Sequence, residues 1–355
     1  MSKQKPMIAL IISGYNEEKV IARTLESAIT AGMRREDIYV VSDNSSDQTM
    51  AVARTLLPDV NVMEVERSGK GLALSKAAAA FGLTERYRWI HVADADGGFA
   101  PNYFRVLRRE LRVKNAAATG YITSTKNSMI GQYRVMEYTV GMEVVRRFQS
   151  FGQVVSVIPG PSSCFRADVF KKLDFASGAL AEDFCVTLQI HRQKLGPIQY
   201  IEDAVVFTQD PQTFRDFTRQ IRRWNIGILQ GIKMYKIGLR PQRIDAYLTY
   251  QVMQNLMMFF TYAIWLPYLA FSQHNFALFP LAFLTDFSLT LLLTTLTAKR
   301  AKRWDILESL PNIYGLRWVA LWVFMSAFVK VMIFNQHRVG RSNGIWQPVA
   351  RKAVS

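Results

Sequence analysis

Short apolar runs alternate with stretches of helical spacing between residue 7 and about residue 125. Apolar runs of four to eight residues indicate buried strands, and apolar positions three and four apart indicate helices. This alternation predicts a parallel α/β sheet, in which binding sites lie at the carboxyl ends of the strands. The predicted strands are 8–12, 38–41, 60–65, 89–92 and 116–122, and the predicted helices are 17–31, 48–57, 71–81 and 103–113.

The pattern changes after residue 125. Residues 126–210 keep helix and strand signals without the regular alternation, and 181–193 has helical spacing. Residues 211–245 carry eight Lys/Arg against two Asp/Glu, interleaved with apolar side chains, which predicts a basic amphipathic helix at a membrane interface. We therefore divide the chain into a catalytic domain (1–210), an interfacial helix (211–245) and a membrane region (246–355).

Two uncharged or nearly uncharged segments in the membrane region are long enough to span a bilayer. Residues 247–271 contain no charge, and 276–296 contain only Asp286. A third apolar stretch, 319–334, contains Lys330. If it crossed the membrane, the basic tail would face outward against the positive-inside rule, so we expect a two-span hairpin plus a tilted, re-entrant or interfacial third helix. The tail residues are Arg338, Arg341, Arg351 and Lys352.

The charge of +16 is concentrated in the same C-terminal part of the chain. Residues 1–210 hold 26 Lys/Arg and 23 Asp/Glu, whereas 211–355 hold 18 and 5. A region that is both basic and apolar fits an anionic lipid surface, and no nucleic-acid-binding motif accompanies it.

Two cysteines without zinc spacing predict neither a disulfide framework nor a zinc site. Since residues 1–6 are polar and 7–12 are too short for a signal peptide, we expect a cytoplasmic catalytic domain on an inner (plasma) membrane protein.

Asp94 and Asp96 follow the predicted strand 89–92. Alternate residues there can direct two carboxylates to one site, and carboxylates that bridge to substrate phosphates are typical of Mg²⁺ or Mn²⁺ sites. An EF-hand starting at Asp94 is excluded because its twelfth position is Arg105. Asp-x-Asp alone is a weak motif.

Two further positions lie in loops after predicted strands. Asp43 follows the second strand, where a carboxylate can accept hydrogen bonds from a nucleobase or ribose, while Asp47 fits an N-cap better. Lys70 lies in a Ser-Gly-Lys-Gly loop before a helix and can lend a cation to a nucleotide, although the spacing is not that of a P-loop. No Gly-x-Gly-x-x-Gly follows the first strand, which argues against a dinucleotide cofactor.

Asp183 and Glu182 open the predicted helix 181–193. Asp183 is a candidate general base for an attacking hydroxyl, but acidic residues at a helix start are also explained by the helix dipole. Further along, Gln220, Arg223 and Trp224 share one helical face. Arginine can grip phosphate oxygens and tryptophan offers a flat surface for a sugar ring, whereas the alternative is a membrane-interface anchor.

Asp286 lies near the centre of the second apolar segment, where it costs about 2.5–3.5 kcal/mol on insertion scales. It either lines a path for a hydrophilic product or is a packed polar residue.

Taken together, these motifs resemble family 2 glycosyltransferases, in particular the membrane-bound processive branch of cellulose, chitin, hyaluronan and poly-N-acetylglucosamine synthases. The segment 13–18 resembles the family's Pro-x-Tyr-Asn-Glu start, and 41–49 resembles its Asp-Gly-Ser-x-Asp-x-Thr segment. Residues 160–166 resemble a small-residue segment that ends in an arginine near the acceptor. The remaining matches are Asp94-Ala95-Asp96, Ala181-Glu182-Asp183 and Gln220-x-x-Arg223-Trp224.

The resemblance implies a GT-A (Rossmann-like mixed sheet) domain and an inverting transfer from a UDP-sugar to an acceptor hydroxyl. It implies Asp183 as catalytic base and Asp96 as ligand of Mg²⁺ or Mn²⁺. The implied donor-binding residues are Tyr15, Glu17, Asp43, Lys70, Asp94, Asp96 and Arg223, and the implied acceptor-binding residues are Gln220, Trp224 and Glu182.

Several departures keep alternatives open. Ser13 and Ala181 replace the usual proline and threonine, and fewer hydrophobic segments are present than in the larger synthases. A β-linked poly- or oligosaccharide product is our first expectation, with a saccharide or lipid-linked acceptor, and a second copy of the chain or an export partner is a candidate for assembly. Single-sugar transfer to a lipid, a nucleotidyltransferase and a non-catalytic membrane partner are the alternatives.

Overall fold

The computed structural model describes residues 7–124 and 128–335, so the predictions for the basic tail lie outside the described residues. Within this part, contacts divide the chain into two units: 7–124 with 155–209, and 128–154 with 210–335. The sequence pattern places 128–154 in the catalytic domain. In the structure these residues form helices that pack into the second unit, because the apolar face of the first of them is buried against other helices there.

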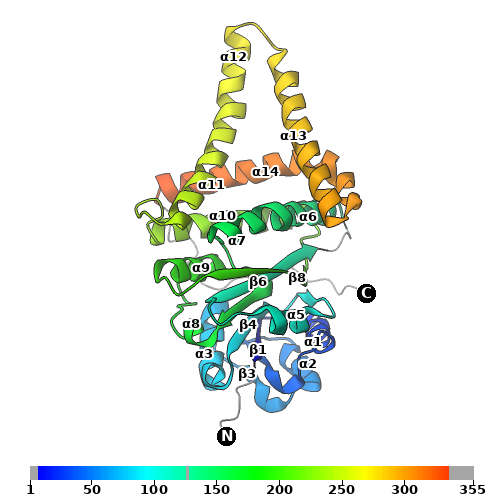
Figure 1. Cartoon of the computed structure of the whole chain (residues 1–355), viewed down its shortest axis with the longest axis vertical. Coiled ribbons are helices and arrows are strands. Elements are labelled where there is room, and N and C mark those ends of the chain that lie inside the picture. The colour runs from blue at the N-terminus through cyan, green and yellow to red at the C-terminus, as the bar shows by residue number, and fades with distance from the viewer. Residues whose placement is uncertain (1–6, 125–127, 336–355) are drawn as a thin grey trace. The chain divides into compact units, whose positions relative to one another are not determined.

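The first unit is built on a mixed sheet (Figure 1). Its eight strands lie in the order β3-β2-β1-β4-β7-β6-β8-β5. The predicted parallel part is formed by β1–β4, and β7 then runs antiparallel between β4 and β6. The strands are β1 (Ile8–Gly14), β2 (Ile38–Ser42), β3 (Val62–Glu64), β4 (Trp89–Asp94), β5 (Gly98–Phe99), β6 (Ala117–Ser124), β7 (Ser163–Arg166) and β8 (Ile198–Thr208).

Helices cover both faces of this sheet, which explains why β1 is apolar at nearly every position. Leu10 and Ile12 face the core shared with α1 and α5, while Ala9 and Ile11 face the core shared with α3 and α9. The helices of this unit are α1 (Ile21–Thr30), α2 (Thr49–Leu56), α3 (Lys70–Ala80), α4 (Leu83–Arg86), α5 (Tyr103–Glu110), α8 (Ala167–Phe170) and α9 (Glu182–Arg192).

Register brings the ends of the central strands to one edge of the sheet. Ser13 on β1 pairs with Asp94 on β4, and Gly14 on β1 pairs with Ser42 on β2. The loops that carry Tyr15, Asp43 and the Asp-x-Asp motif therefore leave the sheet at neighbouring points. The structure confirms that part of the expectation.

The second unit is entirely helical in its described residues. Within the segment 211–245, predicted as one interfacial helix, the structure has α10 over 214–234 and begins α11 at Arg243. Thr213 caps α10, and its hydroxyl accepts the Asp216 amide at 3.1 Å. The elements are α6 (Met129–Val140), η3 (Gly141–Arg146), α7 (Arg147–Gly152), α10 (Phe214–Met234), α11 (Arg243–Phe260), η5 (Thr261–Trp265), α12 (Leu266–Ser272), α13 (Leu278–Ala301), η6 (Trp304–Ser309), α14 (Leu310–Phe328) and η7 (Val329–Ile333).

Protein covers the apolar face of α10. Phe217 and Ile221 lie in a buried cluster with α6 and α14, and Leu229 is fully buried. The amphipathic pattern of this helix is therefore explained by helix–helix packing inside the unit.

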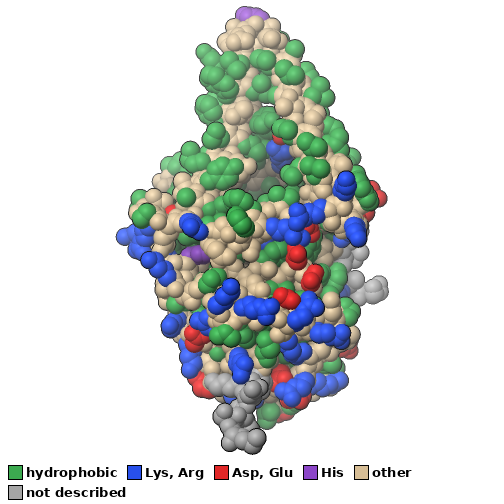
Figure 2. Space-filling view, viewed as in Figure 1, with side chains coloured by type: hydrophobic (Ala, Val, Ile, Leu, Met, Phe, Trp, Pro, Cys, Tyr) green, Lys and Arg blue, Asp and Glu red, His purple; other side chains and the backbone are tan. Residues whose placement is uncertain are grey.

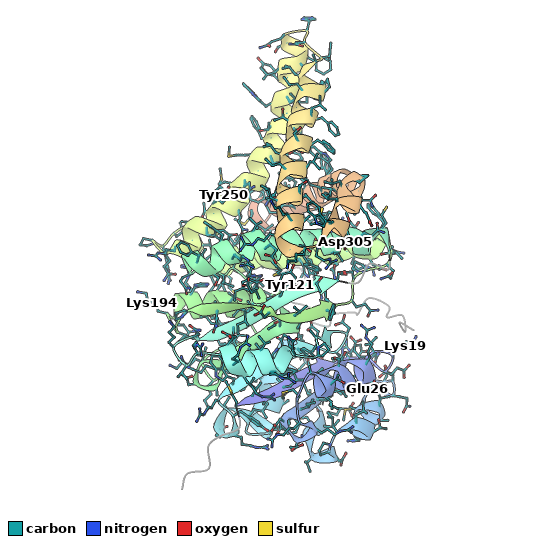
Figure 3. All side chains as sticks on the ribbon, turned by 45° about the vertical axis from the view of Figure 1, so that its right-hand side comes forward. Lys19, Glu26, Tyr121, Lys194, Tyr250 and Asp305 are labelled. Carbon is teal, nitrogen blue, oxygen red and sulfur yellow. The ribbon has the colours of Figure 1, made fainter. Side chains whose placement is uncertain are left out.

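Among residues 7–124 and 128–335, three helical segments are long and apolar enough to cross a membrane: Arg243–Ser272, Leu278–Ala301 and Gly315–Ile333. Many apolar side chains of the hairpin formed by α11, η5, α12 and α13 are exposed, among them Tyr250 (Figures 2 and 3). Asp286 on α13 forms a two-pronged ion pair with Arg317 on α14, at 2.9 and 3.0 Å. This pair supports the packed-polar interpretation of Asp286, because the carboxylate has a guanidinium partner.

Candidate functional site

Lys70 connects two of the predicted acidic motifs. Its ammonium lies 2.5 Å from Asp94 Oδ1 and 3.0 Å from Glu182 Oε1. Asp94 ends β4 and Glu182 opens α9, so one cation draws together carboxylates that are 88 positions apart in the sequence. The sequence predicted a cation for the nucleotide at Lys70, and the structure adds that this cation holds the acidic site together.

The charge of Lys70 is balanced within this cluster. Burial lowers its pKa, but the charges of Asp94 and Glu182 and the hydrogen bond to Asp94 outweigh burial, so the pKa lies above the usual lysine value. Burial and the charge of Glu182 raise the pKa of Asp183 to about 6, against the opposing effect of Lys70. A carboxyl group with a pKa near neutrality is suited to proton transfer.

Asp183 itself is fixed at the start of α9. Its Oδ1 accepts the backbone amide of Phe184 at 2.8 Å, and Thr187 donates to its carbonyl oxygen at 2.7 Å. The helix-start explanation and the catalytic one are thus compatible, because the contact to Phe184 orients the carboxylate through Oδ1 alone.

Asp43 binds the backbone of the loop that precedes Lys70. Its two carboxylate oxygens accept the backbone amides of Ser68 at 2.7 Å and Gly69 at 3.0 Å. Gly69 has φ +87°, a conformation that glycine adopts without strain, and α3 begins at the next residue. Since each carboxylate oxygen can accept a second hydrogen bond, the predicted contact to a nucleotide remains compatible with this role.

The start of the first motif lies beside the same loop. The guanidinium of Arg67 stacks over the Tyr15 ring, 3.2 Å from its centroid. Glu17 is buried, with its amide donating to Thr49 Oγ1 at 2.8 Å. Asp47 accepts the Thr49 amide at 3.0 Å, but it lies one position before Gln48, the N-cap of α2. Arg67 was not predicted from the sequence, since an arginine in a loop gives no signal of its stacking partner.

The Asp-x-Asp loop is held by a residue that the sequence also failed to indicate. The Thr24 hydroxyl on α1 lies 2.7 Å from the carbonyl oxygens of both Ala95 and Gly97, which flank Asp96. Asp96 is partly exposed, so its carboxylate is accessible. In 7–124 and 128–335, no three His, Cys, Asp or Glu side chains are grouped for a metal. Magnesium is commonly held by one or two carboxylates plus substrate phosphates, so Asp96 fits such an ion chemically.

Gly160 packs directly against the Lys70–Asp94 pair. A Cβ there would lie 2.9 Å from Lys70 Nζ and from Asp94 Oδ2, so only glycine fits without displacing the pair.

The other end of the segment 160–166 corrects an expectation. Because β7 is antiparallel to β4, Arg166 pairs with Trp89 at the opposite end of β4 from Asp94. Arg166 instead binds Asp168 and the carbonyl oxygens of Val113 and Asn115.

The remaining predicted residues, Gln220, Arg223 and Trp224, lie on α10 in the second unit. Gln220 Oε1 accepts a hydrogen bond from Arg134 Nη2 at 2.8 Å, and the Arg134 guanidinium lies over the Trp224 ring at 4.8 Å. Gln220 and Trp224 therefore share one partner, which the sequence did not identify. The approach of these residues to the carboxylates of the first unit stays a prediction.

Several known proteins share sequence or fold with this chain. Residues 6–227 match the family model described as glycosyltransferase like family 2. The chain is 25% identical to a probable glycosyltransferase, YdaM of Bacillus subtilis, covering 98% of this chain and 88% of that protein. It is 24% identical to the poly-β-1,6-N-acetyl-D-glucosamine synthase of Staphylococcus epidermidis, covering 62% of this chain and only 54% of the synthase.

A solved structure shows the same fold. The mannosyltransferase PcManGT from Pyrobaculum calidifontis, in complex with GDP-Man and Mn²⁺, superposes with a TM-score of 0.56 at 18% identity, covering 88% of this chain and 87% of that one. The predicted GT-A-like fold is thereby confirmed, and the enzyme class is that of a glycosyltransferase. The chain belongs to the glycosyltransferase like family 2.

Proposed function

We propose that the protein is an inverting, metal-dependent glycosyltransferase that moves a sugar from a UDP-sugar to an acceptor hydroxyl at a membrane, building a β-linked poly- or oligosaccharide. The observation that most directly supports this proposal is the pair of ion pairs that Lys70 forms with Asp94 and Glu182, beside Asp183. It unites a donor-phosphate motif and a candidate base in one site.

The proposed reaction is a single displacement. Asp183 accepts the proton of the acceptor hydroxyl while that oxygen bonds to the anomeric carbon from the face opposite the diphosphate. The bond between the anomeric carbon and the diphosphate oxygen breaks, and UDP leaves with the electron pair. A divalent ion bound through Asp96 would neutralise charge on the diphosphate. Lys70 and Arg223 supply further positive charge for the leaving group.

The other predicted residues are assigned to donor binding or to acceptor binding. Tyr15, Glu17, Asp43 and Asp94 contribute to donor binding, while Gln220, Trp224 and Glu182 contact the acceptor. The exposed apolar hairpin and the basic charge of the C-terminal region support an inner-membrane location with a cytoplasmic catalytic domain.

Asp183→Asn tests the proposed chemistry. The amide keeps the shape of the side chain but cannot take the proton, so transfer should fall about 100- to 10,000-fold, the range for loss of a general base. UDP affinity, measured by calorimetry, should change little. Joint loss of transfer and UDP binding would contradict the assignment.

Product analysis tests donor and product together. The purified protein in lipid nanodiscs is incubated with a panel of UDP-sugars and with GDP-mannose, the nucleotide sugar bound in the mannosyltransferase structure, and the products are sized. A ladder of lengths from a UDP-sugar supports chain building. One added sugar on a lipid would instead favour the single-transfer alternative, and no nucleotide release from any donor would favour a non-catalytic role.

A further inference from the structure

Arg134 on α6 is an unusual residue for a helix interface. Only 1% of it is exposed, and its guanidinium donates to Glu137 Oε2 at 2.5 Å and to Gln220 Oε1 at 2.8 Å. The same group lies 4.8 Å from the Trp224 ring centroid and 4.9 Å from that of Phe217. Two of these four partners belong to the Gln-x-x-Arg-Trp motif.

Packing alone does not explain an arginine at this position. Burying a charge costs several kcal/mol, and an apolar side chain of similar size commonly fills such a space at least as well. Glu137 compensates the charge, yet Arg134 Nε is buried with no hydrogen-bond partner among the residues that the structure describes. The contacts to Gln220 and Trp224 are therefore the features that an apolar residue could not reproduce.

The contact to Gln220 determines which way its amide points. Arginine has donors and no acceptor, so only the amide oxygen of Gln220 can face Arg134. The amide nitrogen is then the group that Gln220 presents to a ligand. A donor at this place suits a hydroxyl or ring oxygen of an acceptor sugar.

Trp224 is the second residue of the motif that Arg134 contacts. The Arg134 guanidinium occupies one face through a cation–π contact. Trp224 packs against the buried cluster of α6, α10 and α14 but is only partly buried, so the exposed part of its ring can contact a sugar. The same guanidinium thus orients a hydrogen-bond donor and a stacking surface that are one helical turn apart on α10.

We propose that Arg134 is a positioning residue for acceptor recognition, acting through Gln220 and Trp224. This inference rests on the proposed function, because it assumes that these two side chains meet the acceptor. Arg134 does not touch the donor in this account, so donor chemistry without acceptor should be independent of it.

Arg134→Lys is the first test, in the full-length protein in nanodiscs. Lysine keeps the charge but cannot donate to Glu137 and Gln220 in the same fixed geometry. We expect the acceptor KM to rise about tenfold, the effect of losing about 1.4 kcal/mol of hydrogen bonding. Donor KM and acceptor-independent UDP release should stay within about twofold. Arg219→Lys is the matched control, since Arg219 lies exposed on the same helix as the motif and pairs with Asp216.

Gln220→Glu keeps the test decisive if the Arg134 variant does not fold. A carboxylate can still accept from Arg134 but has no donor for the sugar. Acceptor KM should rise by a similar factor with an unchanged melting temperature, and Arg134→Lys combined with Gln220→Glu should be little worse than either alone. Unchanged acceptor KM in either folded variant, or an equal fall in UDP release, would overturn the inference. Absence of any transfer by the wild type would instead count against the proposed function.

Discussion

The pH dependence of the reaction offers the sharpest test of the Lys70 cluster. In the structure burial and Glu182 raise the pKa of Asp183 to about 6, while Lys70 opposes them. A base works as the carboxylate, so kcat/KM should fall as pH drops through the pKa, with an acid limb near 6. Removing Lys70 removes a positive charge that stabilises the Asp183 carboxylate, so the acid limb should move to higher pH. Removing Glu182 removes a negative charge that destabilises the Asp183 carboxylate, so the acid limb should move to lower pH.

The size of these shifts follows from the geometry. Lys70 and Glu182 are 31% and 28% exposed, so their fields are neither fully screened nor fully internal. Neighbouring unit charges in such a partly exposed site interact by about 2 kcal/mol at an effective dielectric constant of about 20. Screening reduces this to about 1.4 kcal/mol, which is about one pH unit.

The assay is UDP release at subsaturating donor and fixed saturating metal, from pH 4.5 to 8.5. Lys70→Met and Glu182→Gln are compared with Lys76→Met, an exposed lysine on the same helix α3. Both site variants are expected to have a lower kcat/KM, so the comparison uses only the pH at which the acid limb falls. Shifts in the same direction, or no shift in either variant, would refute this account of Asp183.

Three further predictions concern other contacts. Gly160→Ala should reduce kcat/KM more than tenfold with little change in melting temperature, because its Cβ would displace the ends of the Lys70 and Asp94 side chains; a fully active variant would show that the reaction does not depend on the exact position of this pair. EDTA should stop transfer, Mn²⁺ or Mg²⁺ should restore it, and Asp96→Asn should require more metal; undiminished activity in EDTA would remove the role of Asp96. Asp286→Asn and Arg317→Met should each destabilise the second unit by about 1–3 kcal/mol in thermal unfolding, and the double variant should lose less than the sum.

The parallel part of the sheet could be predicted because its signal is local. Each of β1, β2 and β4 is a short apolar run that ends at a polar loop, and parallel neighbours end at the same edge. The placement of Asp43 and Asp94 at that edge followed directly. The antiparallel insertion of β7 was not predictable in this way, because a four-residue strand carries no sign of its direction, and so Arg166 was misplaced.

The side-chain contacts were harder to predict than the strands. Lys70 was recognised as a cation near a nucleotide site, but nothing in its loop indicated that it would bridge Asp94 and Glu182. Thr24 and Arg67 were overlooked for the same reason: a helical threonine and a loop arginine have many possible partners. Contacts between distant residues depend on how elements pack, which single-sequence periodicity does not encode.

The helix α10 shows why an amphipathic pattern alone does not identify the surface that an apolar face contacts. Its basic and apolar residues fit an interfacial helix, yet Phe217 and Ile221 pack against α6 and α14 within the unit. Such a pattern indicates only that one face of the helix avoids water, and both lipid and protein satisfy that requirement. Arg134 separates the two cases here: a buried guanidinium needs an oxygen acceptor and a carboxylate, and Gln220 and Glu137 provide them. Lipid tails offer neither group, so this polar contact can form only where α10 meets protein.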